Sequence, residues 1–256
     1  NILAPSLISE NYKNNYIEVT DFGDNTVFKI LKLKKKNIFS IYKKVVILLN
    51  KIQKIRDKQT LNFKNKRYVL PIYDKKVLFN ETKLFYDWYI TRKIKKKNPY
   101  KFKKIFSREI LNLISQIHYK NKTFVHRDFH VSNLMKIKDT LALIDNQDAL
   151  IGNKAYDLAS LIDDVRIKTS SNLKKKILNF YLKINKNINK KKFIRDFEIL
   201  SVLRNLKIIG IFARLSIRDR KKRYLKLIPY AWSLIYLRIN KDKIFNDLRS
   251  LLKEIN

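Results

Sequence analysis

The sequence has no cysteine and no run of 18 uninterrupted apolar residues, and glycine and proline number only three and four. Without cysteine the chain can form neither a disulfide nor a thiolate metal site, which fits a reducing compartment such as the cytoplasm. A helix that crosses a bilayer needs about 20 mostly apolar residues. We therefore expect no membrane-spanning helix and no membrane partner.

Acidic residues are also scarce, at 22 against 58 lysines and arginines, which gives a net charge of +36. A charge of this size raises nucleic acid as a partner. The lysines, however, are spread over the whole chain in runs such as 34–36 and 95–97, among many isoleucines and asparagines. A compositional bias of the coding sequence produces the same pattern, so we do not expect specific nucleic-acid binding.

What is present is enough for a folded core. The chain has 256 residues and a hydrophobic fraction of 45%. This length allows one large domain or two modest ones, and this composition does not predict disorder.

Residues 123–164 carry the densest group of candidate catalytic side chains. Two short apolar runs, 123–125 and 141–144, predict strands that lead into polar loops. His-Arg-Asp ends at Asp128, Asn133 follows five residues later, and Asp145 follows twelve residues after Asn133. This is the spacing of a kinase catalytic loop and its metal-binding strand.

Each residue of this pattern has one role in phosphoryl transfer. Asp128 would accept the proton of the substrate hydroxyl, while Asn133 and Asp145 would give oxygen ligands to Mg²⁺, a hard cation that completes its shell with phosphates and water. We expect His126 and Arg127 to hold the loop in shape. Taken singly, an aspartate or asparagine in a loop is usually a turn former or a cap, but the joint spacing favours catalysis.

Three segments resemble a known family: HRDFHVSNLM, LIDNQDALIGNKAYDLASLIDD and LRNLKIIGIFARLSIRDRKKRYL. They are similar to the aminoglycoside phosphotransferase and choline kinase superfamily, and within it to the bacterial anomeric kinases of N-acetylmuramate and N-acetylglucosamine. The resemblance implies an α+β, protein-kinase-like fold with a mostly helical C-terminal lobe. It also implies ATP and Mg²⁺ as cofactors, and phosphorylation of an amino sugar at its anomeric hydroxyl in peptidoglycan recycling.

The chain departs from the family in two ways. Asn146 stands where relatives have an aromatic residue, and the run 161–164 lacks an arginine. The second departure is that the family's phosphate loop and its ATP-binding lysine should precede the segment that begins at Asn1. We therefore expect residues 1–24 to be the remnant of a truncated N-terminal lobe with its hinge, and residues 25–256 to be the catalytic lobe, in an N-terminally incomplete chain.

The resemblance also suggests substrate-binding residues. Glu81 and Trp88 would contact the sugar by a hydrogen bond and by stacking; the alternative is that Trp88 is a core residue and Glu81 a solvated charge. The remaining candidates for substrate contact are Arg127, His130, Gln147, Asp148 and Arg214, the last of which, like Arg204 and Arg218, could pair with a carboxylate of the substrate. His130 could equally be exposed without a role.

The periodicity of apolar residues predicts the remaining elements. We expect a strand at 16–20 that turns at Gly23, helices at 26–34 and 38–55, and a linker at 56–67. An extended segment at 68–73 should lead to a helix capped by Asp74. Further helices are expected at 106–118, 157–165, 173–184, 192–216, 222–237 and 244–252.

Two structural roles follow for the loop region. Asp157 should cap the helix that it begins and accept hydrogen bonds from the catalytic-loop backbone. Gly152 should permit a sharp bend.

Two alternative functions stay open. The first is a kinase of the same fold that acts on choline, an aminoglycoside or a protein. The second is a catalytically silent, basic scaffold that binds RNA or a partner protein. The intact base and metal residues favour an enzyme over the scaffold.

Overall fold

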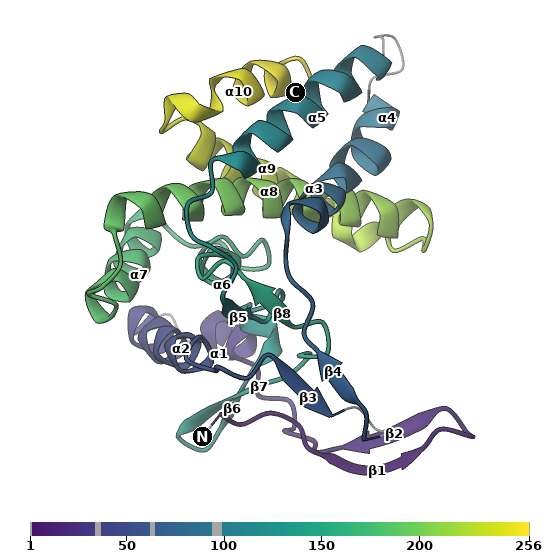
Figure 1. Cartoon of the computed structure of the whole chain (residues 1–256), viewed down its shortest axis with the longest axis vertical. Coiled ribbons are helices and arrows are strands. Elements are labelled where there is room, and N and C mark those ends of the chain that lie inside the picture. The colour runs from purple at the N-terminus through teal and green to yellow at the C-terminus, as the bar shows by residue number, and fades with distance from the viewer. Residues whose placement is uncertain (1, 34–36, 62–64, 94–98, 256) are drawn as a thin grey trace. The chain divides into compact units, whose positions relative to one another are not determined.

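The computed structural model describes residues 2–33, 37–61, 65–93 and 99–255. The lysine runs at 34–36 and 95–97 lie outside these residues. The chain forms two compact units, each made of two separate stretches (Figure 1). The first unit consists of Asn1–Pro71 and Thr123–Lys186, and the second of Ile72–Lys122 and Asn187–Asn256.

Among the described residues of the first unit, the strands form four antiparallel pairs. They are β1 (Leu7–Asn11) with β2 (Tyr16–Val19), β3 (Gln59–Leu61) with β4 (Arg67–Val69), β5 (Thr123–Val125) with β8 (Leu150–Gly152), and β6 (Leu134–Ile137) with β7 (Thr140–Leu143). The pairs β5–β8 and β6–β7 enclose the predicted catalytic segments: β5 ends just before His126, and β7 ends two residues before Asp145.

The helices of the first unit are α1 (Val27–Leu33), α2 (Ile38–Ile52), α6 (Tyr156–Ile162) and α7 (Ser171–Ile184). In α2, Tyr42, Val45 and Leu49 are buried at helical spacing, which confirms the amphipathic helix expected there. Gln53 at its end accepts a hydrogen bond from the Tyr181 hydroxyl at 2.5 Å. This bond ties α2 to α7.

Three local expectations need correction. The expected linker at 56–67 contains β3, which pairs with β4 at the start of the segment that was expected to be extended; both strands are exposed and show no alternation of apolar residues. The helix expected from 106 begins at Pro99, since proline is well tolerated in the first turn. Gly23 has the expected positive φ of 70°, but Gly152 lies in β8 without one.

In its described part, the regular elements of the second unit are helices. Its elements are α3 (Lys75–Leu84), the π-helix η1 (Phe85–Ile90), α4 (Thr91–Lys93), α5 (Pro99–Ser115), α8 (Lys190–Ile217), the 3₁₀ helix η3 (Lys222–Leu227), α9 (Ile228–Ile239), the 3₁₀ helix η4 (Lys243–Phe245) and α10 (Asn246–Lys253). Asp74 caps α3 as expected, because its side chain accepts a hydrogen bond of 2.8 Å from the Val77 N–H.

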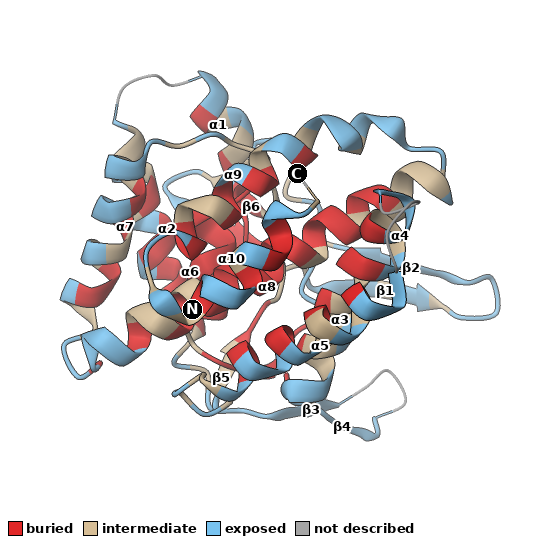
Figure 2. Ribbon diagram, turned by 90° about the horizontal axis from the view of Figure 1, so that it is seen from above, coloured by how far each residue is buried: buried red, intermediate tan, exposed pale blue. Residues whose placement is uncertain are grey.

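The long helix α8 is the core of this unit. Many residues of α8 are buried (Figure 2), and they are not restricted to one stripe. The reason is that α3, η1 and α9 all pack against this helix. Gly210 lets α8 lie close to the end of α3, because a Cβ atom at this position would lie 2.3 Å from the main-chain carbon of Leu84. A helix that is apolar on most sides is typical of a buried position.

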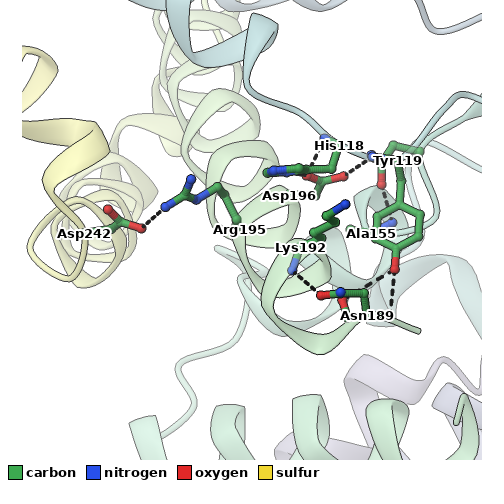
Figure 3. A network of polar contacts seen from close by, with 9 residues as sticks. His118, Tyr119, Ala155, Asn189, Lys192, Arg195, Asp196 and Asp242 are labelled. Atoms are coloured by element: carbon green, nitrogen blue, oxygen red, sulfur yellow. Dashed lines mark hydrogen bonds and ion pairs between the residues drawn. The ribbon is translucent and has the colours of Figure 1, made fainter. Parts of the chain in front are cut away.

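A buried carboxylate joins the end of α5 to α8 (Figure 3). Asp196 accepts hydrogen bonds of 2.8 Å from the main-chain N–H groups of both His118 and Tyr119, and it lies 3.2 Å from His118 Nδ1. Another pair, Arg195 with Asp242 at 3.3 Å, involves the same helix. His118 thus has a place in the packing of the second unit.

In the described part of the chain, no helix combines the length and the apolar character needed to cross a bilayer.

Candidate active site

The loop after β5 has a constrained backbone that a buried carboxylate holds. Arg127 has a φ of 72°, in the left-handed region that costs a non-glycine residue about 1–3 kcal/mol. Asp157, fully buried in α6, accepts hydrogen bonds from the main-chain N–H groups of His126 at 2.7 Å and Arg127 at 3.1 Å. These two bonds stabilise the turn that presents Asp128.

Asp157 does not cap its own helix, contrary to the sequence-based expectation. The helix α6 begins at Tyr156, and its N-cap Ala155 makes no side-chain cap hydrogen bond. The carboxylate of Asp157 points to the catalytic loop instead, where its two oxygens meet two backbone donors. This contact joins segments 30 residues apart in the sequence.

His126 joins the same loop to the end of β7. Its ring is buried, and its Nε2 lies 3.1 Å from the carbonyl oxygen of Ile144. Burial lowers the pKa of His126, although the Ile144 carbonyl and the charges of Asp128 and Asp145 oppose this effect. The neutral ring with its proton on Nε2 suits this position, since a carbonyl oxygen only accepts. His126 therefore connects the loop that carries the predicted base, Asp128, to the strand end that carries the predicted metal ligand, Asp145.

Asn133 connects the predicted base segment to the predicted metal strand. Its Nδ2 donates to the main-chain oxygen of Asp128 and to Oδ2 of Asp145, both at 3.1 Å. Both bonds use the nitrogen of the amide, which leaves Oδ1 as an acceptor. The structure thus brings the three predicted catalytic and metal residues into one group.

Asp145 completes a donor set that suits a hard cation. It has a φ of 66°, again in the left-handed region, and its Oδ1 accepts a 2.7 Å hydrogen bond from Gln147 Nε2. Within the described ranges, no group of three or more His, Cys, Asp or Glu residues could hold a metal. A carboxylate plus an amide oxygen fits Mg²⁺, which keeps several waters and binds phosphates.

The other predicted substrate-binding residues of the first unit lie in the loops next to Asp128 and Asp145. Arg127 Nη1 lies 3.4 Å from the main-chain oxygen and 3.9 Å from Oδ1 of Asp148, whose side chain is 64% exposed. His130 is buried and precedes the short 3₁₀ helix η2 (Val131–Asn133). It is therefore not the exposed residue that one interpretation of the sequence allowed.

Glu81, Trp88 and Arg214 belong to the second unit. Glu81 lies 2.9 Å from Lys207 Nζ and accepts a hydrogen bond from the Tyr73 hydroxyl, so it is not a solvated charge. Trp88 is half-buried in the π-helix η1, and Arg214 lies in the last turn of α8. Helices of the π type are rare and are often found at functional sites.

Two side-chain contacts, Gln147 with Asp145 and Lys207 with Glu81, were not foreseen from the sequence. Gln147 was a candidate for contact with the sugar, yet its side chain binds the predicted metal ligand Asp145. Lys207 was not singled out at all, although it pairs with Glu81. Only its place in the segment LRNLK, next to Arg204, could have drawn attention to it.

A cavity in the first unit is separate from this group of residues. It has a volume of about 600 Å³ and is lined by parts of α1, α2 and the β6–β7 hairpin, among them Val27, Ile41 and Leu141. None of the predicted site residues lines it. The candidate site is therefore identified by its hydrogen-bonded loop residues and not by this cavity.

Comparison of the sequence with known proteins identifies its family. Residues 26–191 match the model of the phosphotransferase enzyme family. The chain is 29% identical over 234 residues to an N-acetylmuramate/N-acetylglucosamine kinase of Neisseria meningitidis, covering 88% of this chain and 67% of that protein. The kinase of the same name from Pseudomonas aeruginosa is 28% identical over 262 residues, covering 98% of this chain and 73% of that protein.

Solved structures with low sequence identity share the fold. A choline/ethanolamine kinase family protein from Mesorhizobium loti superimposes with a TM-score of 0.63 at 9% identity, over 97% of this chain and 77% of that one. The gentamicin complex of APH(2")-IIa gives a TM-score of 0.61 at 15% identity, over 90% and 74%. The α+β, protein-kinase-like fold expected from the sequence is confirmed.

The family match spans well over half of the chain, and it includes both the catalytic loop and the strand that leads to Asp145. The expected resemblance is confirmed as well, together with the class of enzyme that it implies. This chain belongs to the phosphotransferase enzyme family.

Proposed function

We propose that this protein transfers the γ-phosphate of ATP to the anomeric hydroxyl of an amino sugar, N-acetylmuramate or N-acetylglucosamine, in the recycling of peptidoglycan in the cytoplasm. The observation that carries the proposal is the position of Asn133, whose amide bonds both the Asp128 carbonyl and the Asp145 carboxylate. The names of the relatives supply the sugar.

Asp128 is the general base in this proposal. The anomeric hydroxyl gives its proton to the Asp128 carboxylate while its oxygen forms a bond to the γ-phosphorus. The bond between that phosphorus and the bridging oxygen breaks, and ADP leaves. Such a base contributes about 10²–10⁴-fold to the rate, and the rest comes from positioning and charge stabilisation.

Asn133 and Asp145 would hold Mg²⁺, which when bound neutralises charge on the phosphates. Gln147 orients the Asp145 carboxylate, because its amide donates to the Oδ1 atom of that residue. His126 and Asp157 keep the loop in place through the contacts with Ile144 and with the loop backbone. None of these residues needs to change its covalent state in the reaction.

Seven side chains are proposed for sugar recognition. Arg127, His130, Gln147 and Asp148 come from the first unit, and Glu81, Trp88 and Arg214 come from the second. We also propose that residues 1–24 form the end of an N-terminal lobe with its hinge, and that residues 25–256 form the catalytic lobe. Nucleic acid and membrane have no part in this function.

The test is a transfer assay with radiolabelled ATP on the purified protein, including any coding sequence that precedes Asn1. The acceptors are N-acetylmuramate, N-acetylglucosamine, choline and an aminoglycoside, and phosphorus NMR identifies a sugar 1-phosphate as the expected product. Transfer to choline or to the aminoglycoside but to neither sugar would overturn the proposed substrate. A protein that transfers phosphate to none of them would support the scaffold alternative.

Asp128→Asn should lower kcat by about 10²–10⁴-fold without lowering the melting temperature, because it removes the base and keeps the shape. Asp139→Asn is the matched control, since Asp139 is an exposed carboxylate in the turn between β6 and β7. Equal rates for the two variants would contradict the role of Asp128.

A further inference from the structure

The cavity of about 600 Å³ in the first unit lies apart from the predicted site residues. Its walls come from α1, α2 and the β6–β7 hairpin, all of which belong to this one unit. These elements are in contact, since α1 packs against β6 and α2 packs against β7. Pockets that bind small molecules typically have volumes of about 300–1,000 Å³. The cavity is therefore large enough for a ligand of its own.

Two regular faces meet at this cavity, and each carries an aliphatic side chain and a lysine. Ser40, Ile41 and Lys44 line it from α2, at spacings of three and four residues that place them on one side of a helix. Lys136 and Leu141 line it from the hairpin. Because these two residues are cross-strand partners, their side chains point to the same side of the strand pair.

The apolar part of the lining is aliphatic. It consists of Val27, Ile30, Leu33, Ile41 and Leu141. None of the lining residues that the structure describes is aromatic, so they offer no ring on which a base or another planar group could stack. Leu33 is 83% exposed, which leaves an apolar side chain beside the cavity in contact with water. Such walls favour an alkyl chain as the occupant.

The charged part of the lining favours an anion. Lys44 and Lys136 are exposed, and neither of them forms an ion pair with another residue in the described ranges. Asp139 also lines the cavity, so the cations outnumber the carboxylate among the described lining residues. The hydroxyl of Ser40 adds a neutral donor. The lining is thus complementary to a ligand with an alkyl chain and a negative head group.

We propose that this cavity binds an aliphatic monocarboxylate of medium chain length, as a free small molecule and not as part of a membrane. The alkyl chain contacts Ile41 and Leu141, and the ammonium groups of Lys44 and Lys136 attract the carboxylate. This binding does not depend on the proposed transfer reaction, because the residues proposed for catalysis and metal binding take no part in it.

The test is isothermal titration calorimetry of the purified protein with hexanoate, octanoate and decanoate below the concentrations at which they form micelles. One molecule should bind per chain, and each added CH₂ group should lower the Kd by about threefold, because it leaves water on binding. Decyltrimethylammonium, which has the same chain as decanoate with a positive head group, should bind about tenfold more weakly. Equal binding of decanoate and decyltrimethylammonium would contradict the proposal.

Ser40→Phe tests the position of the ligand. Ser40 is exposed, so the fold should tolerate the change, while the added ring occupies part of the cavity. The Kd for decanoate should rise by about tenfold or more, the equivalent of losing two CH₂ contacts, and the melting temperature should not fall. If Ser40→Phe binds decanoate as tightly as the wild type does, the acid binds elsewhere and the proposal is wrong.

Lys44→Glu tests the charge. It should raise the Kd for decanoate by about 3–10-fold and lower the Kd for decyltrimethylammonium. Lys43→Glu is the matched control, because it makes the same change in net charge on the same helix, whereas the Lys43 ammonium lies over the ring of Phe39, 5.5 Å from its centroid. At physiological salt it should have little effect, since distant charges are screened. Equal effects of the two variants would mean that the net charge attracts the acid, and the proposal would be wrong.

A lipid in a bilayer is the other source of the same chemistry. Vesicles with an anionic phospholipid should bind the wild type and Ser40→Phe equally well, because the net charge of +36 attracts them without use of the cavity. If Ser40→Phe lost vesicle binding but kept its affinity for decanoate, the cavity would take a membrane lipid, and the proposal of a free acid would be overturned.

Discussion

At the scale of single residues, the site depends on buried polar groups that fix the backbone. Asp157 and His126 contact the catalytic loop without being candidates for the base or for metal binding. Both roles involve partners far away in the sequence, so the family resemblance could suggest them but only the folded chain gives their geometry.

The lowered pKa of His126 predicts how stability depends on pH. Because burial lowers this pKa in the folded state, the unfolded chain binds more protons than the folded chain once the pH falls below about 6.5. The stability that the neutral ring contributes is complete above that pH and is lost as the pH falls toward the folded-state pKa. Urea unfolding at about pH 7.5 and pH 5.5 measures the loss.

His126→Gln is the matched variant for this measurement, because glutamine does not titrate. The variant should be less stable at neutral pH but should show a smaller fall between the two pH values. If wild type and variant lose equal stability on acidification, His126 is not the residue responsible.

The contact between Gln147 and Asp145 predicts how the activity of a variant depends on the Mg²⁺ concentration. Since its amide orients Asp145 at 2.7 Å, Gln147→Ala should raise the Mg²⁺ concentration needed for half-maximal transfer by about tenfold, the lower end of the effect of residues that orient metal ligands. Gln116→Ala, in which a glutamine of the second unit loses an exposed amide contact at 3.4 Å, is the control. An unchanged Mg²⁺ requirement in Gln147→Ala would argue against Asp145 as a ligand.

At the scale of elements, the helices were predicted far better than the strands. Helices with one apolar face, such as α2, follow from their periodicity. Strand β3 and its pairing with β4 were missed, because both strands are exposed and three residues long. The π-helix η1 was not foreseen either, since its contacts come from α8.

Where α8 crosses the junction of α3 and η1, we expect that one added methyl group at Gly210 lowers the stability strongly. A Cβ atom at Gly210 would lie 2.3 Å from the main-chain carbon of Leu84, which cannot rotate away. Gly210→Ala should therefore destabilise the protein by about 1–3 kcal/mol, although alanine is the better helix former. Thermal unfolding should show a fall of about 3–10 °C.

Gly23→Ala is the comparison for this variant. Gly23 has a φ of 70°, but no atom lies within 4 Å of the position that a methyl group would take there, so only the backbone conformation opposes the change. The expected cost is about 1–2 kcal/mol. If Gly210→Ala were as stable as the wild type, the helices would have to be further apart than the structure places them.

At the scale of the whole molecule, the positive charge is the most conspicuous feature of the sequence. A net charge of +36 should attract any polyanion. We expect RNA binding without sequence preference that falls steeply between about 50 and 200 mM salt, measured by fluorescence anisotropy with two unrelated RNAs. A marked preference for one RNA, retained at the higher salt, would favour the scaffold alternative.

The sequence by itself predicted the candidate catalytic and metal-binding residues, because the spacing of Asp128, Asn133 and Asp145 is a local property of the chain. It also determined most helices, since amphipathic periodicity needs no knowledge of the partner. Only the tertiary structure decided which polar groups are satisfied. The pairing of Lys207 with Glu81, and the burial of Arg204 without a partner in the described chain, depend on how α8 packs against α3 and its other neighbours. No local pattern encodes that packing.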